Sequence, residues 1–220
     1  MDQALKDLSI MIGKDEKVLW FAKPNKKCFI LESIFNPLLP IALIWGAIDF
    51  GVIGFVATQG KTGSSEMLFM LAFFALHLMP VWMYLGGVLM TAQKYKNTAY
   101  IITTKAIYVS GGVLTKNQEM KPFAELSHIN IHRGIFDQWL GVGDVVSLCE
   151  HSGYSSSHSH SKNGITICDI PDYEKVFKMV KELQTDIYSD TMYPNALRPE
   201  NNPGYNTQYN KFQEVDFDNQ

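Results

Sequence analysis

The chain has 220 residues, 46% of them hydrophobic, and a formal net charge of −3. This length has room for one membrane hairpin and one domain of about 100 residues. The near-neutral charge, without one large basic patch, argues against a nucleic-acid partner. Met1–Lys27 has no uninterrupted apolar core, so we expect no cleavable signal peptide there.

The first 37 residues precede a strongly apolar stretch, and we predict that they form a cytoplasmic N-terminal segment. Residues 4–12 place apolar side chains at helical spacing, which predicts a short amphipathic helix on the membrane surface or against a cytoplasmic domain. The segment Glu16–Pro24 looks extended. Pro24 cannot donate to a sheet ladder, so a strand there must be an edge strand or must end there.

Two apolar stretches follow, Leu38–Ala57 and Met67–Met90. As helices rising 1.5 Å per residue, each reaches roughly 30 Å or slightly more, which matches the hydrocarbon core of a bilayer. The polar link at 58–66 is too short to cross back. We therefore predict a transmembrane hairpin at 38–90 (spans 38–57 and 67–90) with a short external loop. A soluble helical core is the alternative, but two runs with so few charges make it the weaker one.

Lysine residues predict the side on which the flanks lie. Before the first span stand Lys6, Lys14, Lys17, Lys23, Lys26 and Lys27, after the second stand Lys94, Lys96 and Lys105, and the link contains Lys61 alone. Cytoplasmic loops contain the excess of lysine and arginine. We expect a multi-pass protein with both termini in the cytoplasm.

Each predicted span contains one ionisable residue, Asp49 or His77, at a similar depth from the external link. A charge near the bilayer centre costs about 2.5–3.5 kcal/mol and turns toward a partner. We predict that Asp49 and His77 face each other or an oligomer interface. A proton or ion path is less favoured, because two helices cannot enclose a pore. Pro80 predicts a kink in the second span.

Residues 97–188 predict a cytoplasmic domain. Runs rich in β-branched and aromatic residues predict strands at Ala99–Thr104, Ala106–Ser110, Val113–Met120, Leu126–His132, Val142–Cys149 and Ile165–Ile170. After Pro171, apolar residues at i, i+3, i+4 and i+7 predict an amphipathic helix on the sheet. Residues 189–220 lack periodicity and end acidic, which predicts a disordered tail.

Cysteine and histidine are the side chains to consider as transition-metal ligands, and only one histidine group is a candidate. Cys28, Cys149 and Cys168 show no ligand spacing and should be free thiols in a cytosol. A hairpin joining the last two strands would bring Cys149 opposite Cys168. Its Ser- and Gly-rich connector contains His151, His158 and His160, a spacing able to bind zinc or nickel. A loop of this composition provides little rigidity for a metal site, so we predict a mobile loop and no metal or cofactor.

In order, these elements resemble the bacterial pleckstrin-homology-like membrane proteins, a former domain of unknown function, in their two-span form. The resemblance rests on Glu16–Pro24, Tyr100–Tyr108, Gly111–Val113, Pro122 and Phe136–Val145. It covers roughly 15–186 and implies a membrane protein of the α+β class: the two-helix hairpin, then a partly open antiparallel β-barrel capped by the C-terminal helix. It also implies a bacterial cell membrane and supplies no catalytic residue.

Three functions remain open. The favoured one is a non-catalytic interaction or scaffold module, which binds a protein partner through a strand edge or the tail. The second is a reader of anionic lipid headgroups through basic residues near the surface, namely Lys94, Lys96, Lys105 and Arg133. The third is a membrane enzyme or small transporter built on Asp49 and His77. No P-loop, nucleophile elbow or His-Glu-x-x-His motif is present, so we expect no enzyme. Glycines and polar groups in the spans predict a homo-oligomer.

Overall fold

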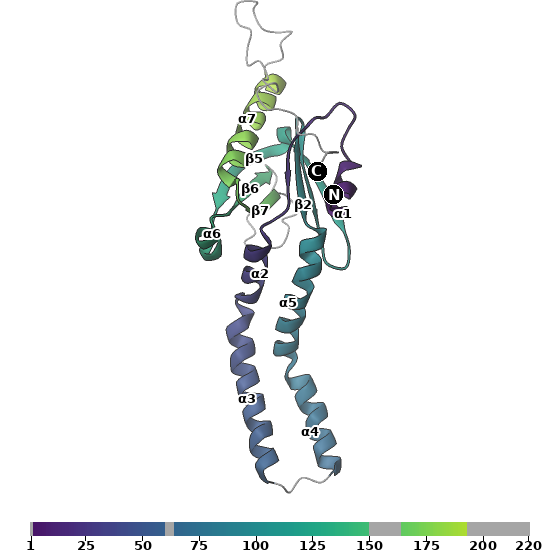
Figure 1. The fold of residues 1–220 in the computed structure, drawn as a ribbon, viewed down its shortest axis with the longest axis vertical. Coiled ribbons are helices and arrows are strands. Elements are labelled where there is room, and N and C mark those ends of the chain that lie inside the picture. The colour runs from purple at the N-terminus through teal and green to yellow at the C-terminus, as the bar shows by residue number, and fades with distance from the viewer. Residues whose placement is uncertain (1, 60–63, 150–163, 193–220) are drawn as a thin grey trace, which may run out of the picture. The chain divides into compact units, whose positions relative to one another are not determined.

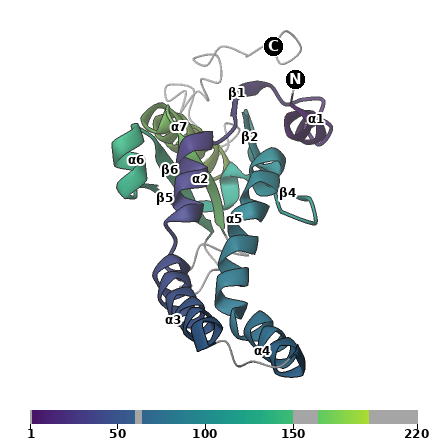
Figure 2. The same ribbon diagram turned by 60° about the horizontal axis from the view of Figure 1, so that its bottom comes forward.

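The computed structural model describes residues 2–59, 64–149 and 164–192, and is shown in two orientations in Figures 1 and 2. The chain divides into two compact units. The first combines residues 1–29 with 94–220, and we call it the sheet unit. The second comprises residues 30–93, and we call it the helical unit.

Short segments of regular structure make up the sheet unit. In chain order they are α1 (Gln3–Ser9), β1 (Val18–Ala22), β2 (Ala99–Thr103), β3 (Ala106–Gly111), β4 (Asn117–Pro122), the 3-10 turn η1 (Phe123–Glu125), β5 (Leu126–His132), α6 (Ile135–Leu140), β6 (Gly143–Cys149), β7 (Gly164–Ile170) and α7 (Tyr173–Met192). α2 (Lys26–Ile34) begins in this unit and runs into the next. The helical unit contains α3 (Leu38–Gln59), α4 (Ser64–His77) and most of α5 (Met79–Asn97).

The strands form two antiparallel sheets, with the orders β1-β2-β3-β4 and β5-β6-β7. Among the described residues no ladder joins one sheet to the other, so the strands do not close into a barrel. The sequence predicts a partly open barrel; the described residues instead form two separate antiparallel sheets and a C-terminal helix.

Every residue of β2 is buried, because both faces of its sheet are covered. Side chains alternate along a strand. Tyr100 and Ile102 belong to the main core with Val176 and Val180 of α7. Ile101, on the other face, packs in a second cluster with residues of α1. Figure 1 accordingly shows α1 and α7 on opposite sides of this sheet.

The N-terminal segment is part of this domain. β1 pairs with β2 at the edge of the four-stranded sheet and ends before Pro24, as the sequence predicts for an edge strand. The buried residues of α1, Leu5 and Leu8 among them, cover the second face of that sheet. The structure thus adds α1 and β1 to the domain predicted at 97–188.

The register of the last hairpin differs from the prediction. Leu148 pairs with Gly164 and Val145 with Ile167, so Cys168 lies near the start of β6. The expectation that Cys149 lies opposite Cys168 is wrong. A hairpin register is set by its turn, and the connector 150–163 has no short turn motif from which the register can be read.

The C-terminal helix begins just after Pro171, as predicted. α7 buries Val176, Val180 and Leu183 on one face, in keeping with its amphipathic pattern. It continues to Met192, four residues into the segment predicted as a tail. The rest of that tail, 193–220, lies outside the described residues.

The helical unit contains one helix, Leu38–Thr58, that by itself is long and apolar enough to cross a membrane. The second predicted span is two helices, 68–77 and 79–97, bent by 56°. Taken as one broken span, this pair raises the number of candidate spans to two. The bend lies at Leu78, two residues before Pro80, the residue from which the sequence predicts a kink.

Candidate functional site

At the bend between α4 and α5, two backbone carbonyls accept hydrogen bonds from side chains. The N–H of Val81 donates to the carbonyl of Leu78 at 2.9 Å rather than to that of His77, one residue earlier. The His77 carbonyl instead accepts from Nε1 of Trp45 on α3 at 2.8 Å. The carbonyl of Ala75 accepts from Nε1 of Trp82 at 3.0 Å. Two indole N–H groups therefore pair with the His77 and Ala75 carbonyls where the helix is broken, while Pro80, which has no N–H, removes the helical donor of the Leu76 carbonyl.

The structure brings the two predicted intramembrane residues together at this bend. Nδ1 of His77 lies 2.9 Å from Oδ1 and 3.0 Å from Oδ2 of Asp49. Asp49 is almost fully buried, whereas the His77 side chain is 39% exposed. Trp45 precedes Asp49 by four residues, so both lie on one face of α3 and reach His77 together.

Aromatic rings surround the His77 imidazole. The Phe73 ring is stacked on it, with centroids 5.2 Å apart, and the Trp45 ring is tilted against it at 5.2 Å. Phe74 meets it edge-on at 6.5 Å. Within the described residues the carboxylate of Asp49 is hydrogen-bonded to His77. The Asp49–His77 pair, surrounded by aromatic rings, suits a hydrogen-bonded link between α3 and α4. A catalytic site needs further polar groups that converge on the same point.

The four basic residues proposed to meet lipid headgroups do not form one cluster. Nη2 and Nε of Arg133 donate to the carbonyls of Asp137 and Val142, at 3.3 and 2.9 Å, and its guanidinium lies over the Tyr173 ring. Arg133 is thus engaged within its own domain. Lys94 and Lys96 precede β2, whereas Lys105 lies beyond its other end. A five-residue strand separates these ends by roughly 17 Å.

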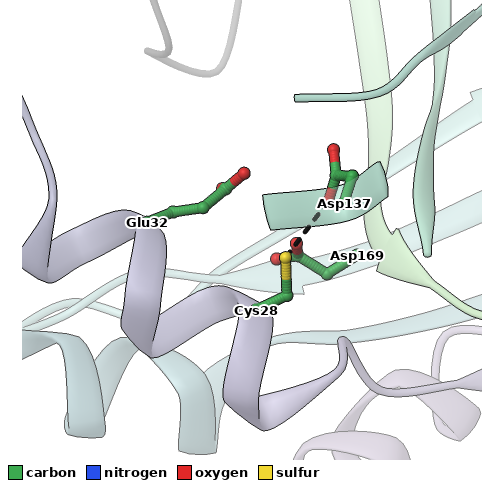
Figure 3. A group of neighbouring side chains, drawn as sticks. All are labelled: Cys28, Glu32, Asp137 and Asp169. Carbon is green, nitrogen blue, oxygen red and sulfur yellow. Dashed lines mark hydrogen bonds between the residues drawn. The ribbon is translucent and has the colours of Figure 1, made fainter. Parts of the chain in front are cut away.

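A second group of ligand-type side chains lies inside the sheet unit, and sequence reasoning missed it. The Cys28 thiol sulfur and carboxylate oxygens of Asp137 and Asp169 lie within 4.8 Å of one another (Figure 3), and all three residues are buried. Glu32, also labelled there, belongs to the helical unit, and we do not count it. The separations along the chain, from 28 to 137 to 169, give no spacing that a motif search recognises.

Local capping interactions position these three side chains. Oδ1 of Asn25 accepts from the N–H groups of Lys27 and Cys28 at the start of α2, and the Asn25 N–H donates to the Asp169 carbonyl at 2.8 Å. Oδ2 of Asp137 accepts from the Gly134 N–H at 2.8 Å, which caps α6. These caps bring the first turn of α2 against α6 and the end of β7.

The chemistry of Cys28 in this group is that of a hydrogen-bond donor. Its thiol donates to Oδ1 of Asp137 at 3.2 Å. Burial raises the pKa of the Cys28 thiol, and the neighbouring carboxylates of Asp137 and Asp169 raise it further. This hydrogen bond joins the first turn of α2 to α6 inside the sheet unit.

The remaining predicted metal ligands, His151, His158 and His160, lie outside the described residues. The side chain of Cys149 is also outside the described part of the structure. Cys28 and Cys168 are free thiols, as the sequence predicts.

A comparison with protein-family models matches residues 41–184 to the family described as bacterial PH domain. The matched range runs from α3 into α7 and covers more than half of the chain. A search of curated proteins found no match, and neither did a search of solved structures.

Proposed function

Because the chain belongs to the bacterial PH domain family, we propose that it is a membrane-anchored, non-catalytic interaction module. α3 forms one transmembrane span, and α4 with α5 forms the other. The PH-like sheet unit and both chain ends lie on the cytoplasmic side, where the sheet unit binds a protein partner.

The observation that supports this proposal most directly is the exposure of α3. Only 17% of its apolar window is buried. Its exposed large side chains include Leu43, Ile44, Ile48, Phe50 and Phe55. The core helix of a soluble protein buries such side chains, whereas a span presents them to lipid. A bilayer fits this helix best.

The broken second span fits the same proposal. Backbone polar groups in lipid must find partners inside the protein, so a kink is tolerated only where its freed carbonyls are paired. The indoles of Trp45 and Trp82 supply partners for two carbonyls at the bend. The lysine-rich flanks then favour a cytoplasmic sheet unit.

The edge strand β4 supports protein binding over headgroup binding. β4 pairs with β3 and ends the four-stranded sheet, and half of its residues are exposed, Met120 among them. An exposed edge can accept a strand from a partner. The headgroup alternative needs a dense basic cluster, and the four candidate cations are dispersed.

The test is affinity capture of the full-length chain from native membranes. We expect the chain to resist carbonate extraction and to retain a specific protein. Met120→Asp should lower that retention about tenfold or more, since a charge opposes an added apolar strand. Ile10→Asp, at another exposed apolar position, is the matched control and should leave the retention of the partner unchanged.

Two results would contradict the proposal. Extraction of the chain by carbonate would rule out the anchor. Equal retention of the partner by the wild type and by Met120→Asp would rule out the β4 edge as the binding site. Binding to anionic lipid that depends on Lys105, without a retained protein, would favour the headgroup reader instead.

A further inference from the structure

Among the described residues of the sheet unit, four large apolar side chains are at least 75% exposed: one is Ile10, just after α1, and the other three lie in the β3–β4 turn and on α6. Leu114 in the β3–β4 turn is 89% exposed, and Ile135 and Trp139 on α6 are 83% and 75% exposed. Ile135 and Trp139 are four residues apart and share one face of α6. Asp137 lies between them in sequence and points into the unit, where it is buried. The apolar face of α6 therefore points outward.

α6 lies beside the point where the chain leaves the sheet unit. Asp137 of α6 accepts the hydrogen bond of Cys28 in the first turn of α2 (Figure 3). The sheet unit ends one residue later, at Phe29. From Cys28 to Leu38, the first residue of α3, the chain advances ten positions, or about 15 Å if helical.

The β3–β4 turn lies beside the point where the chain re-enters. Nδ2 of Asn97, the last residue of α5, donates to the Gly112 carbonyl at 3.1 Å, and the Asn97 carbonyl accepts from Ser110 at 2.6 Å. Gly112 adopts φ +112°, and a Cβ there would meet the Thr115 carbonyl oxygen at 1.9 Å. Leu114 lies in this tight turn, two residues after Gly112, whose carbonyl is bonded to the end of α5.

Aromatic and basic side chains gather between these two points. The rings of Phe29 and Tyr95 meet edge-on, with centroids 5.9 Å apart. The ammonium of Lys94 lies over the Phe29 ring at 5.6 Å. That of Lys23 lies over Tyr95 at 5.0 Å and is also ion-paired with Asp2 at 2.8 Å within the sheet unit. Aromatic rings paired with lysine are typical of the headgroup layer of a membrane.

We propose that Leu114, Ile135 and Trp139 form a lipid-contact surface that inserts into the headgroup–acyl boundary of the bilayer on both sides of the chain crossing. The inference rests on the proposed membrane anchor. We assign lipid as the occupant because the β3–β4 turn and α6, which contain these side chains, both adjoin the segments that lead into the spans. Isolated exposed hydrophobic residues need no explanation, but these stand at both crossings, and tryptophan favours this layer. The surface would fix the orientation of the sheet unit on the membrane.

The test uses the full-length chain in bacterial membranes, with the photoreactive residue p-benzoylphenylalanine at one position at a time. Leu114 and Trp139 are the test positions. Phe55, exposed on α3, is the positive control for the anchor, and Lys105, beyond the far end of β2, is the negative control. After irradiation, mass spectrometry detects phospholipid adducts. We expect adducts at Leu114, Trp139 and Phe55, at least tenfold above the level at Lys105.

Each other outcome overturns the inference in a distinguishable way. Adducts at Phe55 without adducts at Leu114 and Trp139 would leave the anchor intact and remove the lipid-contact surface. Protein adducts in place of lipid adducts at Trp139 would replace lipid by a protein occupant. Absence of lipid adducts at Phe55 would contradict the anchor itself, and the lipid-contact surface with it.

Discussion

The imidazole of His77 lies 2.9 Å from one carboxylate oxygen of Asp49 and 3.0 Å from the other, and so links α4 to α3. Removal of His77 leaves a buried carboxylate without this partner. We expect His77→Leu to lower the free energy of unfolding by roughly 1–3 kcal/mol, the range for leaving a buried polar group without its hydrogen bond. The measurement is unfolding of the full-length chain in mixed micelles.

A double-mutant cycle separates this pair from general packing. Asp49→Leu in the His77→Leu background removes the orphaned group, so the double variant should regain part of the loss. Leu76→Ala, a neighbouring and largely exposed position, should change little. Additive losses in the cycle would show that the two side chains are energetically independent.

The indole of Trp45 donates to the His77 carbonyl that the bend leaves free. Trp45→Phe keeps a ring against His77 but removes the donor. We expect a loss of about 0.5–1.5 kcal/mol in the same unfolding measurement, as for one neutral hydrogen bond. In a Pro80→Ala background, where the backbone N–H returns and the helix can straighten, the loss should shrink. An unchanged loss would contradict the compensating role of the indole.

The buried face of α1 should stabilise the sheet unit. Leu8 is fully buried against β2 and β3, whereas Ile10, two residues on, is 83% exposed. We expect Leu8→Ala to cost about 2–3 kcal/mol in chemical denaturation of the full-length chain, since it opens a cavity. Ile10→Ala should cost under about 0.5 kcal/mol. Equal effects would mean that α1 does not pack on the sheet in solution.

The Cys28 thiol should resist alkylation in the folded protein. Burial and the neighbouring carboxylates raise its pKa, so the reactive thiolate is scarce at pH 8. We expect iodoacetamide followed by peptide mapping to leave Cys28 unmodified until denaturant is added. Rapid modification of Cys28 in the folded chain would contradict the packed contact between α2 and α6.

Local patterns in the sequence predict the elements well and their long-range partners poorly. The apolar period of α7 and the proline at the bend predict a helix and a kink from neighbouring residues alone. The contact of Cys28 with Asp137 spans 109 positions, and no local spacing encodes it. The same holds for β1, which pairs with a strand about 80 positions further along the chain.

The candidate site shows the same division. A similar distance from the link between two apolar runs predicts Asp49 opposite His77, because two helices of a hairpin share that link as a reference. The indole donors cannot be read from the sequence, since they depend on which carbonyls the bend frees. The relative position of Cys149 and Cys168 cannot be read from it either, because the connector between their strands does not define a register.

The central claim, a membrane hairpin with a cytoplasmic sheet unit, is tested most directly by cysteine labelling in intact protoplasts with a membrane-impermeant maleimide. Thr58→Cys, at the exposed end of α3, and Lys105→Cys, in the β2–β3 turn, are compared with the unsubstituted chain. We predict labelling of Thr58→Cys in intact protoplasts and of Lys105→Cys only after lysis. Labelling of Lys105→Cys from outside, or of both positions only after lysis, would contradict the proposed topology.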